Sequence, residues 1–300
     1  MTAVVDVRHL EKRYGSFVAV EDVSFSVEEG EIFGILGPNG SGKTTTVECL
    51  QGLRHADGGD LSVLGYDPRV AAKQLRRQIG SQLQESALPD RMKVWEALDL
   101  FSSLVPEGPA WEAVIDQWGL APKRAAKFGN LSGGQQQRLF VALAVVNAPR
   151  LVFLDEMTTG LDPMSRRVTW DLVRQVRDQG TTVVLVTHFM DEAEELCDRI
   201  AVIDQKRVVA IDTPDGLIER FGGGFTVTFS TDATELGFLD QVDEVENVTR
   251  EGRRVTVVGH GALLASAAAA LVAHGLKPLD LATHRASLED VFLTITGKES

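Results

Sequence analysis

The chain has 300 residues, of which 44% are hydrophobic and 24% are charged, and its formal net charge at pH 7 is −13. Its length favours two domains, and its composition is typical of a folded protein with a sizeable core. The negative charge argues against general binding to nucleic acid or to an acidic membrane surface, because both of these partners are themselves negative.

The sequence predicts neither a membrane span nor an export signal. The longest weakly polar stretch, residues 261–273, is rich in alanine and well short of the roughly 20 apolar residues of a spanning helix. Charges near the amino terminus interrupt the apolar core that a signal peptide needs, so we expect a cytosolic chain whose membrane role, if any, goes through another protein. Cys49 and Cys197 lack metal-ligand spacing and are interpreted as packing residues.

The amino-terminal half begins with two stretches of alternating residues, 3–14 and 17–27, which favour a pair of antiparallel strands joined at Gly15. Residues 31–36 (EIFGIL) are typical of a buried strand. A glycine-rich turn and a helix through about Leu53 follow, and this order of strand, turn and helix is the opening of an α/β unit.

Farther along, residues 85–150 predict a helical subdomain interrupted at 105–110 and 119–130. Two short apolar strands, 151–156 and 181–188, flank a helix of 3.6-residue period, so a parallel sheet core resumes there and the fold class is α/β. After the glycine-rich segment 219–225, three strand candidates and an alanine-rich helix predict a small α+β domain. The expected domains are residues 1–221 and 222–300.

The glycine-rich turn contains a phosphate-binding pattern. Gly37, Gly42, Lys43 and Thr44 fit G-x-x-x-x-G-K-[ST] between a strand and a helix, a context that disfavours an ordinary glycine turn. The glycines let backbone N–H groups face phosphate oxygens, Lys43 supplies a positive charge, and Thr44 is expected to bind Mg²⁺. The other residues of the turn that we expect to contact the nucleotide are Pro38, Asn39, Gly40, Ser41 and Thr45.

Polar residues end the two later strands. Asp155 closes the first of them, where a carboxylate can hold Mg²⁺ opposite Thr44, and the adjacent Glu156 can polarise an attacking water. Capping of the next helix is the alternative role for both carboxylates. His188 ends the second strand at the same edge of the sheet, where it can bind the γ-phosphate or the water; an isolated histidine there is more often incidental.

A second anion-binding helix terminus follows from residues 131–138 (LSGGQQQR). Ser132 is placed as a helix cap, and Gly133 and Gly134 expose backbone N–H groups, although an ordinary capped helix has the same appearance. One chain cannot easily fold two such termini onto one phosphate. At this point the sequence resembles the ATP-binding cassette family, whose signature is LSGGQ. The resemblance covers nearly all of residues 4–220 and implies that two cassettes pair head to tail, with each ATP clamped between the phosphate loop of one subunit and the signature of the other.

The resemblance also implies roles for individual residues. Ser132, Gly133, Gly134 and Gln135 would contact the ATP of the partner subunit. Tyr14 resembles the aromatic residue that stacks on adenine, although a tyrosine in a strand is usually a packing residue. Gln84 resembles a glutamine that touches Mg²⁺ or the attacking water and senses the transmembrane partner, with Gln82 as a rival because this segment departs from the usual pattern. Asp162, in the segment TTGLDP, is expected at the subunit interface.

Residues 28–46 and 286–297 resemble a narrower group, the ATPases of drug, antibiotic and polysaccharide exporters whose permease is a separate polypeptide. This implies an ATPase at the cytoplasmic face of the cell membrane that powers transport of a drug-like, lipid or polysaccharide substrate through a multi-span permease. The second ATPase subunit is expected to be an identical copy. The predicted catalytic residues are Glu156, His188, Lys43 and Gln84, and the predicted cofactors are ATP and Mg²⁺.

The alternative function is that of an ATPase of the same family that acts on nucleic acid or ribosomes. Such proteins carry long coiled coils, zinc modules or a second cassette, none of which is present, and the net charge is unfavourable. We therefore expect no nucleic-acid partner. For residues 222–300, support of a dimer interface and simple covering of apolar surface both stay open.

Overall fold

The computed structural model describes residues 3–83, 87–104, 110–222 and 224–297. It divides into two compact units, one ending at Thr213 and the other beginning at Pro214. The sequence predicts this boundary after residue 221, because glycines follow there. The structure instead places helix α8 (Pro214–Phe221) in the second unit, where it packs against helix α10 (Leu288–Thr296).

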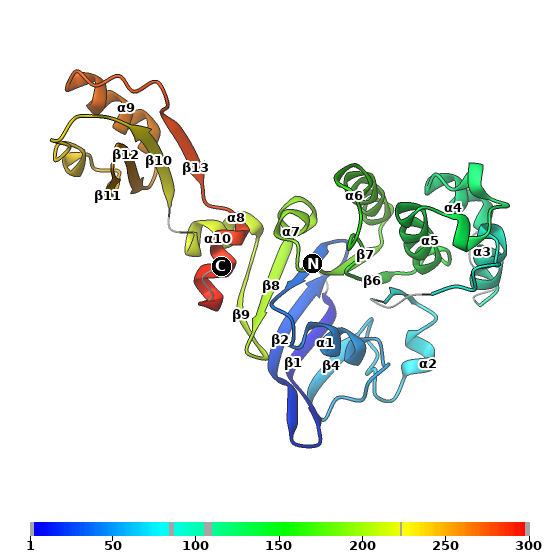
Figure 1. Cartoon of the computed structure of the whole chain (residues 1–300). Coiled ribbons are helices and arrows are strands. Elements are labelled where there is room, and N and C mark those ends of the chain that lie inside the picture. The colour runs from blue at the N-terminus through cyan, green and yellow to red at the C-terminus, as the bar shows by residue number, and fades with distance from the viewer. Residues whose placement is uncertain (1–2, 84–86, 105–109, 223, 298–300) are drawn as a thin grey trace. The chain divides into compact units, whose positions relative to one another are not determined.

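The first unit contains a nine-stranded sheet in the order β4-β1-β2-β9-β8-β3-β7-β6-β5 (Figure 1). Strand β1 pairs antiparallel with β2 and β4, whereas β3, β5, β6, β7 and β8 run parallel. The predicted antiparallel pair and the predicted parallel core are therefore confirmed. The strands are β1 (Ala3–Tyr14), β2 (Phe17–Glu28), β3 (Ile32–Leu36), β4 (Gly58–Val63), β5 (Ile79–Gln82), β6 (Leu151–Asp155), β7 (Thr182–Val186), β8 (Arg199–Asp204) and β9 (Arg207–Asp212).

The parallel strands bring four chain segments to one edge of the sheet. Val186 in β7 lies opposite both Ile35 in β3 and Asp155 in β6, and Leu154 lies opposite Gln82 in β5. Because parallel strands end at the same edge, the residues that follow β3, β5, β6 and β7 converge there, which is where open α/β sheets bind ligands.

A continuous apolar core holds the antiparallel strands against the parallel ones. Helix α1 (Lys43–Leu50) contributes Val47, Cys49 and Leu50 to a cluster that also contains residues of β1, β2, β3, β4, β6, β7 and β8. Every residue of β3, β6 and β7 is buried, as expected of parallel strands that are covered on both faces. The two cysteines belong to this buried interior. Burial raises the pKa of the Cys49 thiol to about 11, and Cys197 is also a buried free thiol, so both are packing residues as predicted.

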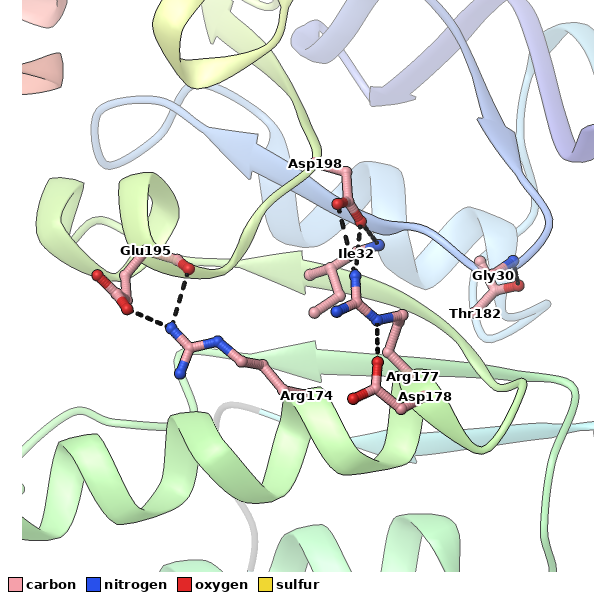
Figure 2. Close-up of polar contacts among 8 residues, drawn as sticks. All are labelled: Gly30, Ile32, Arg174, Arg177, Asp178, Thr182, Glu195 and Asp198. Atoms are coloured by element: carbon pink, nitrogen blue, oxygen red, sulfur yellow. Dashed lines mark hydrogen bonds and ion pairs between the residues drawn. The ribbon is translucent and has the colours of Figure 1, made fainter.

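Helices α5 (Gly133–Val145), α6 (Pro163–Asp178) and α7 (Met190–Leu196) lie on the opposite side of β6 and β7 from α1 (Figure 1). Polar contacts fasten α6 in place (Figure 2). Arg174 binds both the carboxylate and the backbone oxygen of Glu195 on α7. Arg177 reaches Asp198, 3.4 Å away, whose carboxylate also accepts the backbone N–H of Ile32 at the start of β3. The carboxyl-terminal end of α6 is thus linked, through Asp198, to the start of β3.

The helical subdomain contains α3 (Val94–Ser102), α4 (Trp111–Gln117) and α5, as the sequence predicts, and α5 packs against β5. A short helix, α2 (Ala72–Leu75), precedes β5. The break predicted at 119–130 holds two single 3₁₀ turns, Ala121–Lys123 and Phe128–Asn130. Most of the other predicted break, residues 105–109, lies outside the described residues.

The second unit contains a four-stranded antiparallel sheet in the order β11-β12-β10-β13. Its strands are β10 (Phe225–Ser230), β11 (Val245–Glu251), β12 (Arg254–Gly259) and β13 (Ala282–Arg285), and helix α9 (Leu263–Ala273) packs on β10. The three predicted strands and the alanine-rich helix are confirmed. Among the helices in the described part of the chain, none is long and apolar enough to cross a membrane.

Candidate functional site

The loop after β3 is shaped by close approaches of backbone to its glycines. A Cβ atom at Gly37 would lie 2.2 Å from the backbone oxygen of Ile203 in β8 and 2.6 Å from Ser41 Oγ. Gly42 has φ +102°, and a Cβ atom there would lie 2.6 Å from the backbone oxygen of Ala19 in β2. The loop therefore lies in close contact with β8 on one side and β2 on the other. Only glycine fits at positions 37 and 42.

Lys43 folds back over this loop. Its Nζ donates hydrogen bonds to the backbone oxygens of Gly37, at 2.7 Å, and Pro38, at 3.1 Å. Burial lowers the pKa of Lys43, and the charges of Glu156 and Asp155 act in the opposite direction. A phosphate oxygen that enters the loop would compete with two neutral carbonyl groups, and an anion is the stronger partner for an ammonium group.

Asp155, at the end of β6, lies next to Thr44, the second residue of α1. Burial raises the pKa of Asp155 to about 6, with the charge of Glu156 as the next cause, while the adjacent Thr44 hydroxyl lowers this pKa. Asp155 Oδ1 is buried and accepts no hydrogen bond from any residue that the structure describes. A carboxylate with a spare oxygen next to a hydroxyl fits the oxygen ligands of Mg²⁺, which is commonly held by few protein groups and completed by phosphate and water.

Glu156 and His188 meet at the edge of the sheet. His188 Nδ1 lies 3.1 Å from Glu156 Oε1, and the two side chains come from the ends of β6 and β7. Glu156 adopts a left-handed backbone with φ +51°, and its N–H donates to the Val186 oxygen at 2.8 Å. A non-glycine residue with this conformation is strained and is a recurrent feature of functional sites.

Four of the residues described above, Gly42, Lys43, Thr44 and Glu156, border one pocket of about 320 Å³. It is lined by Phe17, Ala19, Asn39, Gly40, Gly42, Lys43, Thr44, Thr45 and Glu156. Phe17 was not anticipated from the sequence, although an exposed aromatic residue directly after a hairpin turn is a signal that could have found it. Tyr14 pairs with Phe17 across the hairpin but is not among the lining residues, so adenine stacking by Tyr14 stays a prediction.

The segment LSGGQ begins α5. Ser132 caps this helix by accepting the backbone N–H of Gln135, whose Oε1 accepts the N–H of Ser132 at 3.0 Å. Ser132 and Gly133 are exposed, and Gly134 lies against Ser165 at the start of α6. No residue of this segment lines the described pocket around the phosphate loop.

Comparisons with known proteins agree with this geometry. The family model described as "ABC transporter" matches residues 20–159. The chain is 38% identical to a Nod factor export ATP-binding protein I of Burkholderia orbicola (strain AU 1054), over 99% of this chain and 98% of the relative. The chain belongs to the ABC transporter family.

Other ABC proteins are similar over much of their length. A daunorubicin resistance ATP-binding protein of Streptomyces coeruleorubidus is 36% identical, over 96% of this chain and 93% of the relative. A solved ATP-binding subunit of an ABC transporter superposes with a TM-score of 0.66 at 27% identity, over 73% of this chain and 93% of that chain. The protein is thus an ATP-binding subunit of the ABC family that hydrolyses ATP.

Two further predicted site residues are Asp162 and Gln84, of which the structure describes only Asp162. Asp162 is exposed and caps α6 by accepting the N–H of Ser165 at 3.0 Å and its hydroxyl at 2.6 Å, and these bonds lower the pKa of Asp162. Its role at a subunit interface stays a prediction. Gln84 lies outside the described residues. Its rival Gln82 is buried at the end of β5, where its Nε2 donates to the Leu83 oxygen at 3.0 Å.

Proposed function

We propose that this chain powers an exporter through a separate multi-span permease, from the cytoplasmic face of the membrane. The relatives named for Nod factor export and for daunorubicin resistance support export as the direction of transport. They also support a drug-like, lipid or polysaccharide cargo. Cargo contacts would belong to the permease. The observation that most strongly supports the chemistry is the pairing of Glu156 with His188 at the edge of the pocket that contains Lys43.

Each of these residues has a distinct task when ATP occupies the pocket. Lys43 exchanges its two carbonyl partners for oxygens of the β- and γ-phosphates and stabilises their charge. Glu156 accepts the proton of the attacking water as a general base. His188 holds the Glu156 carboxylate in the required orientation through Nδ1 and can contact the γ-phosphate. Mg²⁺, held by the Thr44 hydroxyl and the Asp155 carboxylate, would supply further positive charge next to the phosphates.

A complete site requires a second subunit in this proposal. Ser132 and Gly133 are exposed at the amino-terminal end of α5, yet no residue of LSGGQ lines the described pocket around the phosphate loop of its own chain. A helix terminus with exposed N–H groups favours an anion. We infer that a second copy of the chain presents its LSGGQ segment to the γ-phosphate, and that closure of the two copies drives the permease.

Glu156→Gln tests the catalytic assignment. The substitution keeps the size of the side chain but removes the general base, so ATP hydrolysis should fall by roughly a hundredfold or more while ATP binding is retained. Nucleotide titration and steady-state phosphate release would measure the two effects. Glu195→Gln, which changes a carboxylate on α7 that pairs with Arg174, is the matched control. An unchanged hydrolysis rate for Glu156→Gln would refute the assignment.

The transport partner is tested by isolating the native complex from detergent-solubilised membranes. A multi-span membrane protein is expected to copurify with the chain. Recovery of the chain with ribosomes or DNA instead would contradict the proposal and favour the nucleic-acid alternative.

A further inference from the structure

Glu192, on α7, is a buried carboxylate that the proposed mechanism does not use. Its side chain is fully buried, and its Oε1 accepts a hydrogen bond from the indole Nε1 of Trp170 on α6 at 3.0 Å. Its Oε2 accepts no hydrogen bond from any residue within the described ranges. A buried polar atom without a partner is destabilising, and more so when it is charged, so the second oxygen requires an explanation.

The immediate neighbours of this carboxylate are two threonine hydroxyls. Burial raises the pKa of Glu192, and the hydroxyls of Thr187 and Thr158, which lie beside the carboxyl group, act to lower it. Thr187 already uses its oxygen to accept the backbone N–H of Phe189 at 3.0 Å. Thr158 is fully buried, and its Oγ1 has no hydrogen-bond partner among the residues that the structure describes. The buried cluster of Glu192, Thr158 and Thr187 thus contains one acceptor, Glu192 Oε2, and one hydroxyl, that of Thr158, that make no hydrogen bond within the described residues.

The positions of these threonines in the chain connect the Glu192 cluster to the candidate functional site. Thr158 follows Glu156 by two residues, and Thr187 directly precedes His188. One carboxylate therefore lies against both of the segments that hold the Glu156–His188 pair. Burial, which raises the pKa of Glu192, is opposed in part by the positive charge of Arg166 on α6.

We propose that Glu192 is a positioning residue for ATP hydrolysis: in the catalytic complex the Thr158 hydroxyl donates to Glu192 Oε2 and fixes the Glu156 segment against the His188 segment. The inference rests on the roles assigned above to Glu156 and His188. A small shift of the loop after Glu156 pairs two buried groups that are otherwise unsatisfied. A purely structural role would need only Oε1, which Trp170 already occupies. A displacement of a catalytic base by about 1 Å can lower the rate of reaction by roughly a hundredfold.

Thr158→Val is the decisive variant, because it removes the hydroxyl and nearly preserves the shape of the side chain. The lost hydroxyl makes no hydrogen bond in this structure, so the midpoint of thermal unfolding should stay the same or rise. The kcat for ATP hydrolysis should fall about tenfold, with little change in the KM for ATP. Thr158→Ser keeps the hydroxyl and should retain most of the wild-type kcat.

A double-mutant cycle assigns the effect to the pair. Glu192→Gln keeps an oxygen that can accept from Trp170 but replaces the carboxyl Oε2 with an amide group, and the double variant with Thr158→Val should be no slower than the slower single variant. A wild-type kcat for Thr158→Val, equal losses for Thr158→Val and Thr158→Ser, or additive effects in the cycle would overturn the inference. Normal hydrolysis by Glu156→Gln would instead show that the proposed function itself is wrong.

Discussion

At the scale of single residues, Gly37 and Gly40 of the phosphate loop require glycine for different physical reasons. Gly37 and Gly40 are three residues apart, but a Cβ atom at Gly37 would collide with the Ile203 backbone, whereas at Gly40 it would meet nothing within 4 Å. Gly40 needs glycine only for its φ of +80°. The two positions therefore separate steric exclusion from backbone strain.

Gly37→Ala should reduce both stability and ATP affinity. The added methyl group must push the loop away from β8, which we expect to cost about 2 kcal/mol in the free energy of unfolding and at least about tenfold in the dissociation constant of ATP. Gly40→Ala should cost about 1 kcal/mol from backbone strain alone, with a smaller loss of affinity. Urea unfolding and nucleotide titration would measure these effects, and equal losses in the two variants would contradict the steric explanation.

The site residues differ in how far the sequence could predict them. The order of strands and turns predicts that five site residues lie at one edge of the sheet. The structure brings these residues together there: Lys43, Thr44, Asp155, Glu156 and His188. The left-handed backbone of Glu156 could not be predicted, because it depends on a hydrogen bond to β7 and not on a local preference. The lining position of Phe17 likewise depends on how the hairpin packs over the loop.

At the scale of elements, two helices begin with the same capping chemistry. Ser132 and Gln135 form a reciprocal capping box at the start of α5, and Ser287 and Asp290 form another at the start of α10. The sequence predicts Ser132 as the cap of the first helix, but not the reciprocal bond from Gln135. Only the first lies in a segment that we assign to nucleotide binding, so the two caps form a natural control for each other.

Ser132→Ala and Ser287→Ala should have similar effects on stability and different effects on function. Each substitution removes an N-cap side chain and should lower the free energy of unfolding by about 1 kcal/mol. Only Ser132→Ala should also reduce ATP hydrolysis, by about tenfold, since it removes a proposed contact to the partner's nucleotide. Denaturant unfolding and phosphate release would measure both. A matching loss of hydrolysis in Ser287→Ala would show that the signature serine acts through helix stability alone.

At the scale of the whole molecule, the α/β class, the parallel core and the carboxyl-terminal α+β fold follow from residue patterns. The boundary between the units does not. Glycines at 222–224 mark a turn in the sequence, but the partner of α8 is α10, which lies about 70 residues farther along. A contact between such distant segments leaves no trace in local periodicity.

Truncation tests this boundary. In a chain that ends after Phe221, α8 has lost α10, so Leu217 and Ile218, both buried in the full structure, should become exposed. A chain that ends after Thr213 lacks this helix. We expect the longer fragment to aggregate more and to bind more of a hydrophobic dye than the shorter one, as light scattering and dye fluorescence would measure. The reverse order would place α8 with the first unit.

The internal hydrogen bonds of Lys43 have one further consequence. Because this ammonium group is already stripped of much of its water and pointed into the loop, an arriving triphosphate meets a charge that needs only to change partners. The energetic penalty of dehydrating a lysine is met when the chain folds, not when the nucleotide arrives. Because Lys43 is already positioned, the binding energy of each new ATP is not spent on ordering or dehydrating this side chain.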